Sequence, residues 1–371
     1  MIQKLAKAQF EIVRFAPKKG VSGFHDALRR NVDEYFEKTG LSPYRNRLMV
    51  WKTVAMLAIY FVPFIAIVSG VYTVSPVLFY LSWFLMAVGM VGIGCSVMHD
   101  GNHGAYTGRK GRDKFIGLVI HLVGGNDITW KIQHNILHHT YTNIEGLDQD
   151  VDAGILLRFT PHSRKVAMHR FQHIYAWFIY GLMTMYWCTA KDFMGVVSYH
   201  KMGLLRKEKI SLGSALVEVT LSKILYFAIF LVLPLLFSGA GWIAVLIGFI
   251  GMHFIAGLSL ACIFQLAHVM EESDFAAPND ERKMENSWAV HQLQNTVNFA
   301  PKSKIMSWFI GGLNFQIEHH LFPQICHVHY PKLAPIVAKT AAEHGLQYQV
   351  RPTFMNALGA HAQMLRHLGR S

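Results

Sequence analysis

Three short clusters of histidine residues are the part of this sequence best suited to chemistry. They are His99-Asp100-Gly101-Asn102-His103, His134-Asn135-Ile136-Leu137-His138-His139 and Gln316-Ile317-Glu318-His319-His320. Neutral imidazole is a good ligand for iron, zinc and copper. Imidazole groups at adjacent or four-residue spacing in three separate places are hard to explain by packing, so the sequence predicts a metal site.

Helical spacing indicates how these groups share metal ions. Residues four apart lie on one face of a helix, so His99 can act together with His103, and His134 with His138. A neighbouring residue lies roughly 100° further round the helix and can face a second ion. The adjacent pairs at 138–139 and 319–320 therefore predict two metal ions in one site.

The number and type of candidate ligands argue against the commoner metal sites. A structural zinc ion needs four ligands and a catalytic one three plus water, so the clusters exceed a single zinc centre. The metalloprotease motif HExxH is absent. The carboxylate-rich ligand pattern of soluble di-iron bundles is missing as well. A histidine-rich dinuclear iron centre fits best.

Histidines outside the clusters are read differently. Isolated ones are expected to be surface or hydrogen-bonded residues, namely His162, His200, His344 and His361. His253 lies in the middle of an apolar stretch, where an ionisable group is costly and usually has a buried role. We leave its role unassigned.

The elements that must position the clusters are membrane helices. Of 371 residues, 52% are apolar and 16% charged, which predicts a membrane domain with a sizeable aqueous cap. Crossing a bilayer core of about 30 Å takes roughly 20 apolar residues. Four stretches approach this length and pair as two hairpins across short turns, namely residues 53–72, 77–98, 221–237 and 242–264.

The distribution of charge predicts which side the clusters face. Neither short turn carries Lys or Arg, whereas the N-terminal segment, the region between the hairpins and the C-terminal region are rich in both. By the positive-inside rule these segments, and with them the clusters and both termini, face the cytoplasm. Shorter apolar pieces at 115–123 and 174–188 are read as interfacial or re-entrant helices. If 174–188 crossed instead, the second hairpin would invert.

The predicted fold is an all-α integral membrane protein with four transmembrane helices in two hairpins and a cytosolic helical cap that holds the metal site. Its parts are an N-terminal cytosolic segment (1–47), the membrane domain (48–346) and a C-terminal cytosolic tail (347–371). The basic first twenty residues lack an apolar core of signal-peptide length, so export is not expected.

The remaining composition excludes two other classes. The net charge of +12 is spread over every segment outside the apolar stretches, which favours contact with anionic lipid headgroups over nucleic acid. The four cysteines lie far apart with no CxxC pair. Neither a disulfide framework nor a zinc knuckle is indicated.

The motifs HDGNH, HNILHH and GGLNFQIEHHLFP (residues 311–323) resemble the three histidine boxes of membrane fatty-acid desaturases. The resemblance extends from about Arg45 to Leu346. A third box that begins with Gln316 is similar to that of front-end desaturases and bacterial linoleoyl-CoA-desaturase-like proteins. The resemblance implies a cytosolic di-iron centre that uses O2 and two electrons to insert a cis double bond into an acyl chain carried by CoA or a lipid.

The resemblance also implies a ligand set. The matching positions are His99, His103, His134, His138, His139, His319 and His320, and the family takes a further ligand from the end of the fourth span, where this chain has His268. Gln316 offers an amide, a weaker ligand that could bind loosely, hold a water or hydrogen-bond a neighbour. Asp100, Asn102 and Glu318 lie inside the boxes and are candidates to orient imidazole N–H groups.

Front-end desaturases often carry a fused cytochrome b5 domain, but only about 47 residues precede the first span here and the HPGG haem motif is absent. We therefore expect a separate electron donor, either a ferredoxin or cytochrome b5 with its reductase, to dock on the basic cytosolic surface. The missing haem domain and the lack of a dilysine-type tail favour a bacterial cytoplasmic membrane over the endoplasmic reticulum.

An unactivated methylene has no acidic proton, so a metal-based oxidant is required and the protein provides placement. We expect a narrow apolar tunnel with a headgroup site at the basic face. Trp130, Phe315 and Trp308 are candidates for its lining, although helix packing also explains them. Two alternatives stay open: an acyl hydroxylase, epoxidase or ketolase, and a metal transporter, whose ligands would lie within the spans. Chain length, double-bond position, acyl carrier and oligomeric state are not predicted.

Overall fold

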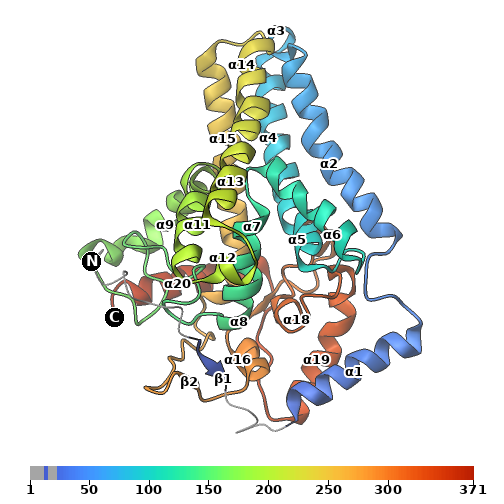
Figure 1. Cartoon of the computed structure of the whole chain (residues 1–371), viewed down its shortest axis with the longest axis vertical. Coiled ribbons are helices and arrows are strands. Elements are labelled where there is room, and N and C mark those ends of the chain that lie inside the picture. Colours follow the sequence, from blue (N-terminus) through green and yellow to red (C-terminus); the bar gives the residue numbers. More distant parts are fainter. Residues whose placement is uncertain (1–11, 16–22) are drawn as a thin grey trace.

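The computed structural model describes residues 12–15 and 23–371. The basic first eleven residues and residues 16–22 lie outside this described part, so most of the predicted N-terminal segment does too. The described chain is mostly helical, with a tall bundle of long helices above a broader cap of short ones (Figure 1).

Four helices of the described chain are long and apolar enough to cross a membrane, as expected of a membrane protein. The first is α2 (Arg47–Val68), and the fourth is α15 (Trp242–His268). The second is made of three consecutive segments, α4 (Pro76–Gly92), η2 (Ile93–Val97) and α5 (Met98–His103). The third is made of α13 (Leu212–Phe227), η7 (Ala228–Val232) and α14 (Leu233–Phe237). Short connections, one of them containing α3 (Val71–Val74), join them at one end of the bundle, and α5, α8 and α18 lie toward the other (Figure 1).

The long helices differ from the predicted spans mainly at their cap ends. The first begins at Arg47, before residue 53, because the side chain of Asn46 accepts a hydrogen bond from the Met49 amide and caps it. The third begins at Leu212, capped by Ser211, before residue 221. The second continues through the first histidine cluster, so that this cluster is an extension of a membrane helix.

The cap is built from short helices and two small parallel sheets. Its elements are α1 (Phe24–Thr39), α6 (Lys110–Gly117), η3 (Leu118–Val123), α7 (Asp127–Trp130), η4 (Lys131–His138), α8 (His139–Tyr141), η5 (Ala167–Phe171), α9 (Gln172–Gly181), α10 (Met183–Tyr186), η6 (Trp187–Lys191), α11 (Asp192–Lys201), α12 (Leu204–Lys207), α16 (Trp288–Gln294), α17 (Lys304–Phe309), α18 (Gln316–Leu321), η8 (His327–His329), α19 (Tyr330–Glu343) and α20 (Phe354–Leu368), with β1 (Arg14–Phe15) paired to β2 (Lys283–Met284) and β3 (Asn298–Phe299) paired to β4 (Val350–Arg351). The apolar face of α1 packs on α19.

The C-terminal residues 347–371, predicted as a tail, form β4 and α20 instead. Helix α20 packs on α9 and α15 because its apolar side chains recur on one face, and Leu365 and Leu368 join a buried cluster. The guanidinium of Arg158 fixes this end by donating hydrogen bonds to the carbonyls of Leu368 and Ser371. The C-terminal segment is therefore part of the folded body.

The two shorter apolar pieces form α6 with η3, and α9 with α10 and η6. Neither is among the helices of the described chain that could span a membrane. Large apolar side chains on both remain exposed, among them Phe115, Ile174 and Phe178. Exposed apolar side chains on short helices beside the bundle are typical of segments that lie in a membrane interface.

Candidate metal centre

The eight predicted histidine ligands lie in one buried cluster at the cap end of the bundle. Helix α5 carries His99 and His103, η4 and α8 carry His134, His138 and His139, the last residue of α15 is His268, and α18 carries His319 and His320. Neighbouring rings from different elements have centroids 4.5 Å apart for His99 and His319, and 4.7 Å apart for His138 and His268. Segments far apart in the sequence thus bring their imidazoles together.

Two glycines allow the backbone segments to approach one another. A Cβ on Gly101, inside the first box, would lie 2.8 Å from the backbone nitrogen of Gly117, so α5 packs directly on α6. Gly311 has a φ of 62°, and a Cβ there would lie 2.1 Å from the carbonyl oxygen of Cys95. This close contact with η2 positions the segment that leads into α18.

The ring nitrogens fall into overlapping groups whose members lie within 4.8 Å of one another. The groups are His99 with His103, His134 and His319; His138 with His268 and His320; and His139 with His319 and His320. The first two groups share no residue, and the third has members in each of them. Two metal ions side by side would each find at least three imidazoles.

Polar groups outside the cluster bind the outward nitrogens of several rings. Nδ1 of His138 lies 3.0 Å from Oδ2 of Asp148, and Nδ1 of His320 lies 2.8 Å from Oε1 of Gln292. His268 and His319 make longer contacts through Nδ1, to the carbonyl of Asn295 and the hydroxyl of Tyr330 respectively. Acceptors at Nδ1 fix the tautomer that leaves the Nε2 lone pair for a metal.

The inward nitrogens are the ones left without partners. Within the described chain, both ring nitrogens of His99 and the Nε2 atoms of His103, His319 and His320 are buried and have no hydrogen bond. Nε2 of His139 faces Nε2 of His134 at 3.2 Å. Buried polar atoms are rarely left unpaired in proteins. This set of converging, unpaired imidazole nitrogens fits a transition-metal centre.

The electrostatics of the cluster favour neutral rings. Burial and the neighbouring imidazoles lower the pKa of His134, His139, His319 and His320 well below the usual value. His138 differs: burial opposes its charged form, but the Asp148 carboxylate outweighs burial and raises its pKa. Because metals bind deprotonated imidazole nitrogens, the neutral rings are ready to coordinate.

The other predicted site residues have varied surroundings. Gln316 is buried and lines a cavity with His268 and His319. A carboxylate oxygen of Asp100 lies 3.8 Å from Nδ1 of His99, but the closer partner of this carboxylate is Nδ1 of His327 at 2.8 Å.

The other two predicted residues bind groups outside the cluster. The amide of Asn102 binds the Gly117 carbonyl, and Glu318 accepts hydrogen bonds from Asn298 and Tyr348. Within the described chain, neither Asn102 nor Glu318 hydrogen-bonds a ring of the cluster.

Several residues that support the cluster were not singled out from the sequence. Asp148, Gln292 and Tyr330 contact the rings, and His327 links Asp100 to the buried ammonium of Lys52, whose Nζ lies 2.7 Å from Nε2 of His327. Asp148 belongs to an acidic loop just after the second box, which was an available signal. The others are brought to the site only by tertiary packing.

The isolated histidines stay outside the cluster. His162, His344 and His361 each bind a backbone carbonyl, and His361 also contacts the hydroxyl of Tyr180. The mid-span His253 lies 2.9 Å from the hydroxyl of Tyr226. These contacts are those of hydrogen-bonded histidines that stabilise the fold.

A cavity of about 80 Å³, called here the narrow cavity, lies against the rings. Its wall combines apolar and aromatic side chains with four of the cluster histidines, and its lining residues are Trp130, Gln133, His134, His138, Asp150, Val151, Met183, Trp187, Lys191, Phe264, Gln265, His268, Leu313, Gln316 and His319. Of the aromatic residues expected in a tunnel, Trp130 lines this cavity, whereas Phe315 packs in the cap core and Trp308 lies against Lys52.

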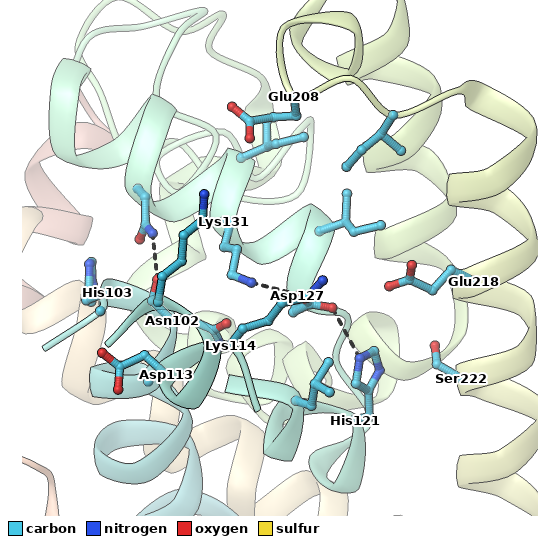
Figure 2. Close-up of a pocket in the computed structure, with 18 of the residues that line it drawn as sticks. Asn102, His103, Asp113, Lys114, His121, Asp127, Lys131, Glu208, Glu218 and Ser222 are labelled. Atoms are coloured by element: carbon cyan, nitrogen blue, oxygen red, sulfur yellow. Dashed lines mark hydrogen bonds and ion pairs between the residues drawn. The ribbon is translucent and has the colours of Figure 1, made fainter. Parts of the chain in front are cut away.

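A second cavity of about 1250 Å³, called here the charged groove, lies between α13 and the segments that carry the first two boxes (Figure 2). It reaches the cluster at His103. Lys131 and His121 bind the carboxylate of Asp127 in its wall, and Glu218 and Ser222 face it from α13. The two cavities therefore meet the histidines through different residues.

A bundle of four membrane helices with a buried cluster of unpaired imidazoles defines the class of integral membrane proteins that have a histidine-rich metal centre. The family model "Fatty acid desaturase" matches residues 75–352. The chain therefore belongs to the fatty acid desaturase family, which confirms the resemblance of its three boxes.

Individual relatives agree with the family match. The chain is 35% identical to an sn-1 linoleoyl-lipid 6-desaturase of Arthrospira platensis, over 93% of this chain and 92% of the relative. It is 32% identical to an sn-1 linoleoyl-lipid 6-desaturase of a Synechocystis species, over 97% and 99% respectively. An acyl-lipid (8-3)-desaturase of Physcomitrium patens is 33% identical over 93% of this chain and 72% of the relative.

These relatives define the activity of the chain as acyl desaturation. It is an oxidoreductase of lipid metabolism, as the resemblance of its boxes implied. Neither the hydroxylase, epoxidase and ketolase alternatives nor the metal transporter is favoured by any of these matches.

Proposed function

We propose that this desaturase holds two iron ions and uses O2 to insert a cis double bond near the carboxyl end of an acyl chain esterified to a membrane lipid. The observation that carries the proposal is the convergence of eight histidines beside the narrow cavity, with the inward nitrogens of four of them unpaired, namely His99, His103, His319 and His320. The choice of an acyl-lipid over acyl-CoA is supported by the relatives, which are named lipid desaturases with position 6 in two of the names.

The proximity groups support an assignment of ligands to the two ions. One ion would be held by His99, His103, His134 and His319, and the other by His138, His268 and His320. The ring of His139 lies near His134 of the first group and near His320 of the second. It would therefore complete the coordination sphere of either ion. Gln316 lines the narrow cavity beside His268. Its amide would hydrogen-bond a water or the His268 ring, and it would not take the place of an imidazole ligand.

The bound iron ions supply the oxidising power to remove hydrogens from an unactivated methylene. The chain's own residues provide placement. Trp130, Met183 and Phe264 would hold the acyl segment beside the rings and keep bulk water away from it. Asp148 and Gln292 would hold the imidazoles in the tautomer that coordinates, because each lies at an Nδ1 atom.

We propose that the cap and both termini face the cytoplasm, since the connections at the opposite end of the bundle carry no Lys or Arg. A separate one-electron carrier, a ferredoxin or cytochrome b5, would dock on the basic cap surface. The cyanobacterial origin of two relatives supports a bacterial membrane.

Expression in a host that lacks the product fatty acid tests the proposal. The host is supplied with linoleate, and its lipids are separated by class, cleaved selectively at sn-1 and analysed for double-bond position. We expect new unsaturation in intact lipids and close to two iron ions per purified chain. Product confined to the acyl-CoA pool would overturn the lipid substrate, and zinc in place of iron would overturn the metal assignment.

A further inference from the structure

The charged groove is lined by groups that an acyl chain does not need. Its ionisable lining contains four lysines and four carboxylates, namely Lys110, Lys114, Lys131, Lys209, Asp113, Asp127, Glu208 and Glu218. One wall is the membrane helix α13, where a carboxylate such as Glu218 is costly unless it faces a water-filled space. Seven apolar residues also line the groove, namely Leu118, Ile128, Ile132, Ile136, Ile210, Leu221 and Leu225. The part of the wall that carries the charged groups fits water better than lipid tails.

A connected polar network forms the membrane side of the groove. Nζ of Lys131 lies 2.8 Å from Oδ2 of Asp127, and Nε2 of His121 lies 3.2 Å from its Oδ1. Glu218 and Ser222 face this network from α13 (Figure 2). Burial would raise the pKa of Asp127, but the hydrogen bonds from His121 and Lys131 hold it well below its usual value. Asp127 is therefore a fixed anion bound by His121 on one side and Lys131 on the other.

The inner end of the groove has hydrogen-bonding atoms that are free to bind water. Nδ2 of Asn135 donates to the backbone carbonyl of Asn102 at 2.9 Å. The Oδ1 atoms of both asparagines are buried without a partner in the described chain. Asn102 is only 6% exposed. Buried sites with several such atoms are where proteins hold ordered water.

The proposed reaction needs an aqueous route. Each turnover removes two hydrogens from the acyl chain, takes two electrons from the carrier and two protons from solvent, and converts one O2 into two waters. The narrow cavity cannot conduct these protons while an acyl chain fills it. The charged groove meets the cluster at His103 from a different side.

We propose that the charged groove is a water-filled path to the active site. It brings protons to the His103 side of the cluster and lets the water formed there leave. His121, Lys131 and Glu218, arranged around Asp127, exchange protons between solvent and the water held by Asn102 and Asn135. This role rests on the proposed iron- and O2-dependent function.

Cysteine accessibility tests whether the groove contains water, with or without iron. Ser222 lines the groove, whereas Ile224 on the same helix is 60% exposed and outside the groove lining. All four native cysteines are buried. In lipid nanodiscs, Ser222→Cys should react with a charged methanethiosulfonate roughly tenfold or more faster than Ile224→Cys, because the reagent needs a thiolate in water. Equal rates would overturn the proposal.

Asp127→Asn tests the function of the network. We expect the turnover rate at saturating lipid to fall roughly tenfold with KM unchanged. The solvent deuterium isotope effect and the peroxide released per O2 should rise, and added imidazole should restore part of the rate. Asp33→Asn, on the exposed face of α1, is the matched control. If Asp127→Asn fails to fold, Glu218→Gln should show the same changes.

The outcomes separate this role from others. A raised KM for lipid with an unchanged turnover rate would make the groove a headgroup site and overturn the proposal. Unchanged rate, isotope effect and peroxide release would also overturn it. Failure of the proposed function would instead be seen in the unmodified protein, as absent iron or absent product, while the cysteine measurement would still report on water in the groove.

Discussion

The narrow cavity and the charged groove meet the same histidine cluster but differ in the number of charged groups that line them. The narrow cavity places Met183, Trp187, Phe264 and Leu313 against the rings. The charged groove has four lysines and four carboxylates along a volume of about 1250 Å³, compared with about 80 Å³ for the narrow cavity. The difference indicates that the two cavities have different roles. The narrow cavity would position the acyl chain, and the charged groove would conduct protons and water.

Two buried carboxylates show the same contrast in their ionisation. Glu318 lies within the third box, and burial raises its pKa to about 7 although Tyr348 and Asn298 donate hydrogen bonds to it. Asp127 in the groove wall has a pKa held well below its usual value by His121 and Lys131. The ionised form of Glu318 is thus disfavoured by burial, whereas the ionised form of Asp127 is stabilised by its hydrogen-bonding neighbours.

The largest effect should come from breaking the point where the two cavities meet. His134→Ala removes a ring that belongs to the narrow cavity and to the group containing His103. We expect activity to fall by more than the roughly 10- to 100-fold typical for loss of a supporting residue, together with loss of iron. Iron content and lipid analysis measure this. His200→Ala, at an exposed position on α11, is the control, and retained iron in His134→Ala would contradict the ligand assignment.

Filling the narrow cavity should affect the acyl chain alone. Met183→Trp adds volume in the cavity wall, so we expect kcat/KM for lipid to fall roughly a hundredfold through misplacement while iron is retained. Product analysis should also show a shifted double-bond position in the residual product. Leu182→Trp adds the same volume at a neighbouring residue that is 39% exposed and should have little effect. Equal loss in both variants would mean that the cavity does not hold the chain.

One wall of the charged groove, helix α13, is held to α11 by a buried ion pair. Lys223 on α13 binds Asp192 on α11, and it also donates to the Gly124 carbonyl. Lys223→Met leaves the Asp192 carboxylate unpaired, so we expect a loss of about 3–5 kcal/mol in unfolding free energy. Thermal inactivation in detergent measures the loss. The double variant with Asp192→Asn should recover part of it, and a single variant as stable as the unmodified protein would show that the pair does not support the wall.

The smallest effect concerns the ionisation of Glu318. Its pKa is raised from 4.5 to about 7 in the folded chain, so the folded state keeps a proton that the unfolded state has lost. This contribution is fully present below about pH 4.5 and is lost as the pH rises through 7. Glu318→Gln should therefore gain stability relative to the unmodified protein over this range. Both proteins carry the same histidines, so a pH-independent difference between their melting temperatures would refute the raised pKa.

The histidine cluster could be predicted because its ligands lie in short helical motifs. Spacing alone placed His99 with His103 and His134 with His138, and the structure brings these rings together. The supporting acceptors could not be predicted in the same way. Gln292 and Tyr330 have no periodic relation to the boxes and reach the rings only through packing of the cap.

The membrane helices were predicted by their apolar length, but the charges near their ends were misleading. The third span was predicted to begin at residue 221. In the structure, α13 begins at Leu212, since Glu218 lines the charged groove and Lys223 pairs with Asp192. Of these two charged residues, only Glu218 lies before the predicted start of the span, and it lines the charged groove.

The continuity of the second membrane helix with the first histidine box has a consequence for lipid dependence. Because one uninterrupted helical segment runs from Pro76 to His103, the depth of the cluster below the membrane plane is fixed by the rise of that helix. A thicker or thinner bilayer tilts such a segment rather than shortening it. A change in bilayer thickness would therefore change the orientation of the histidine cluster relative to the membrane plane.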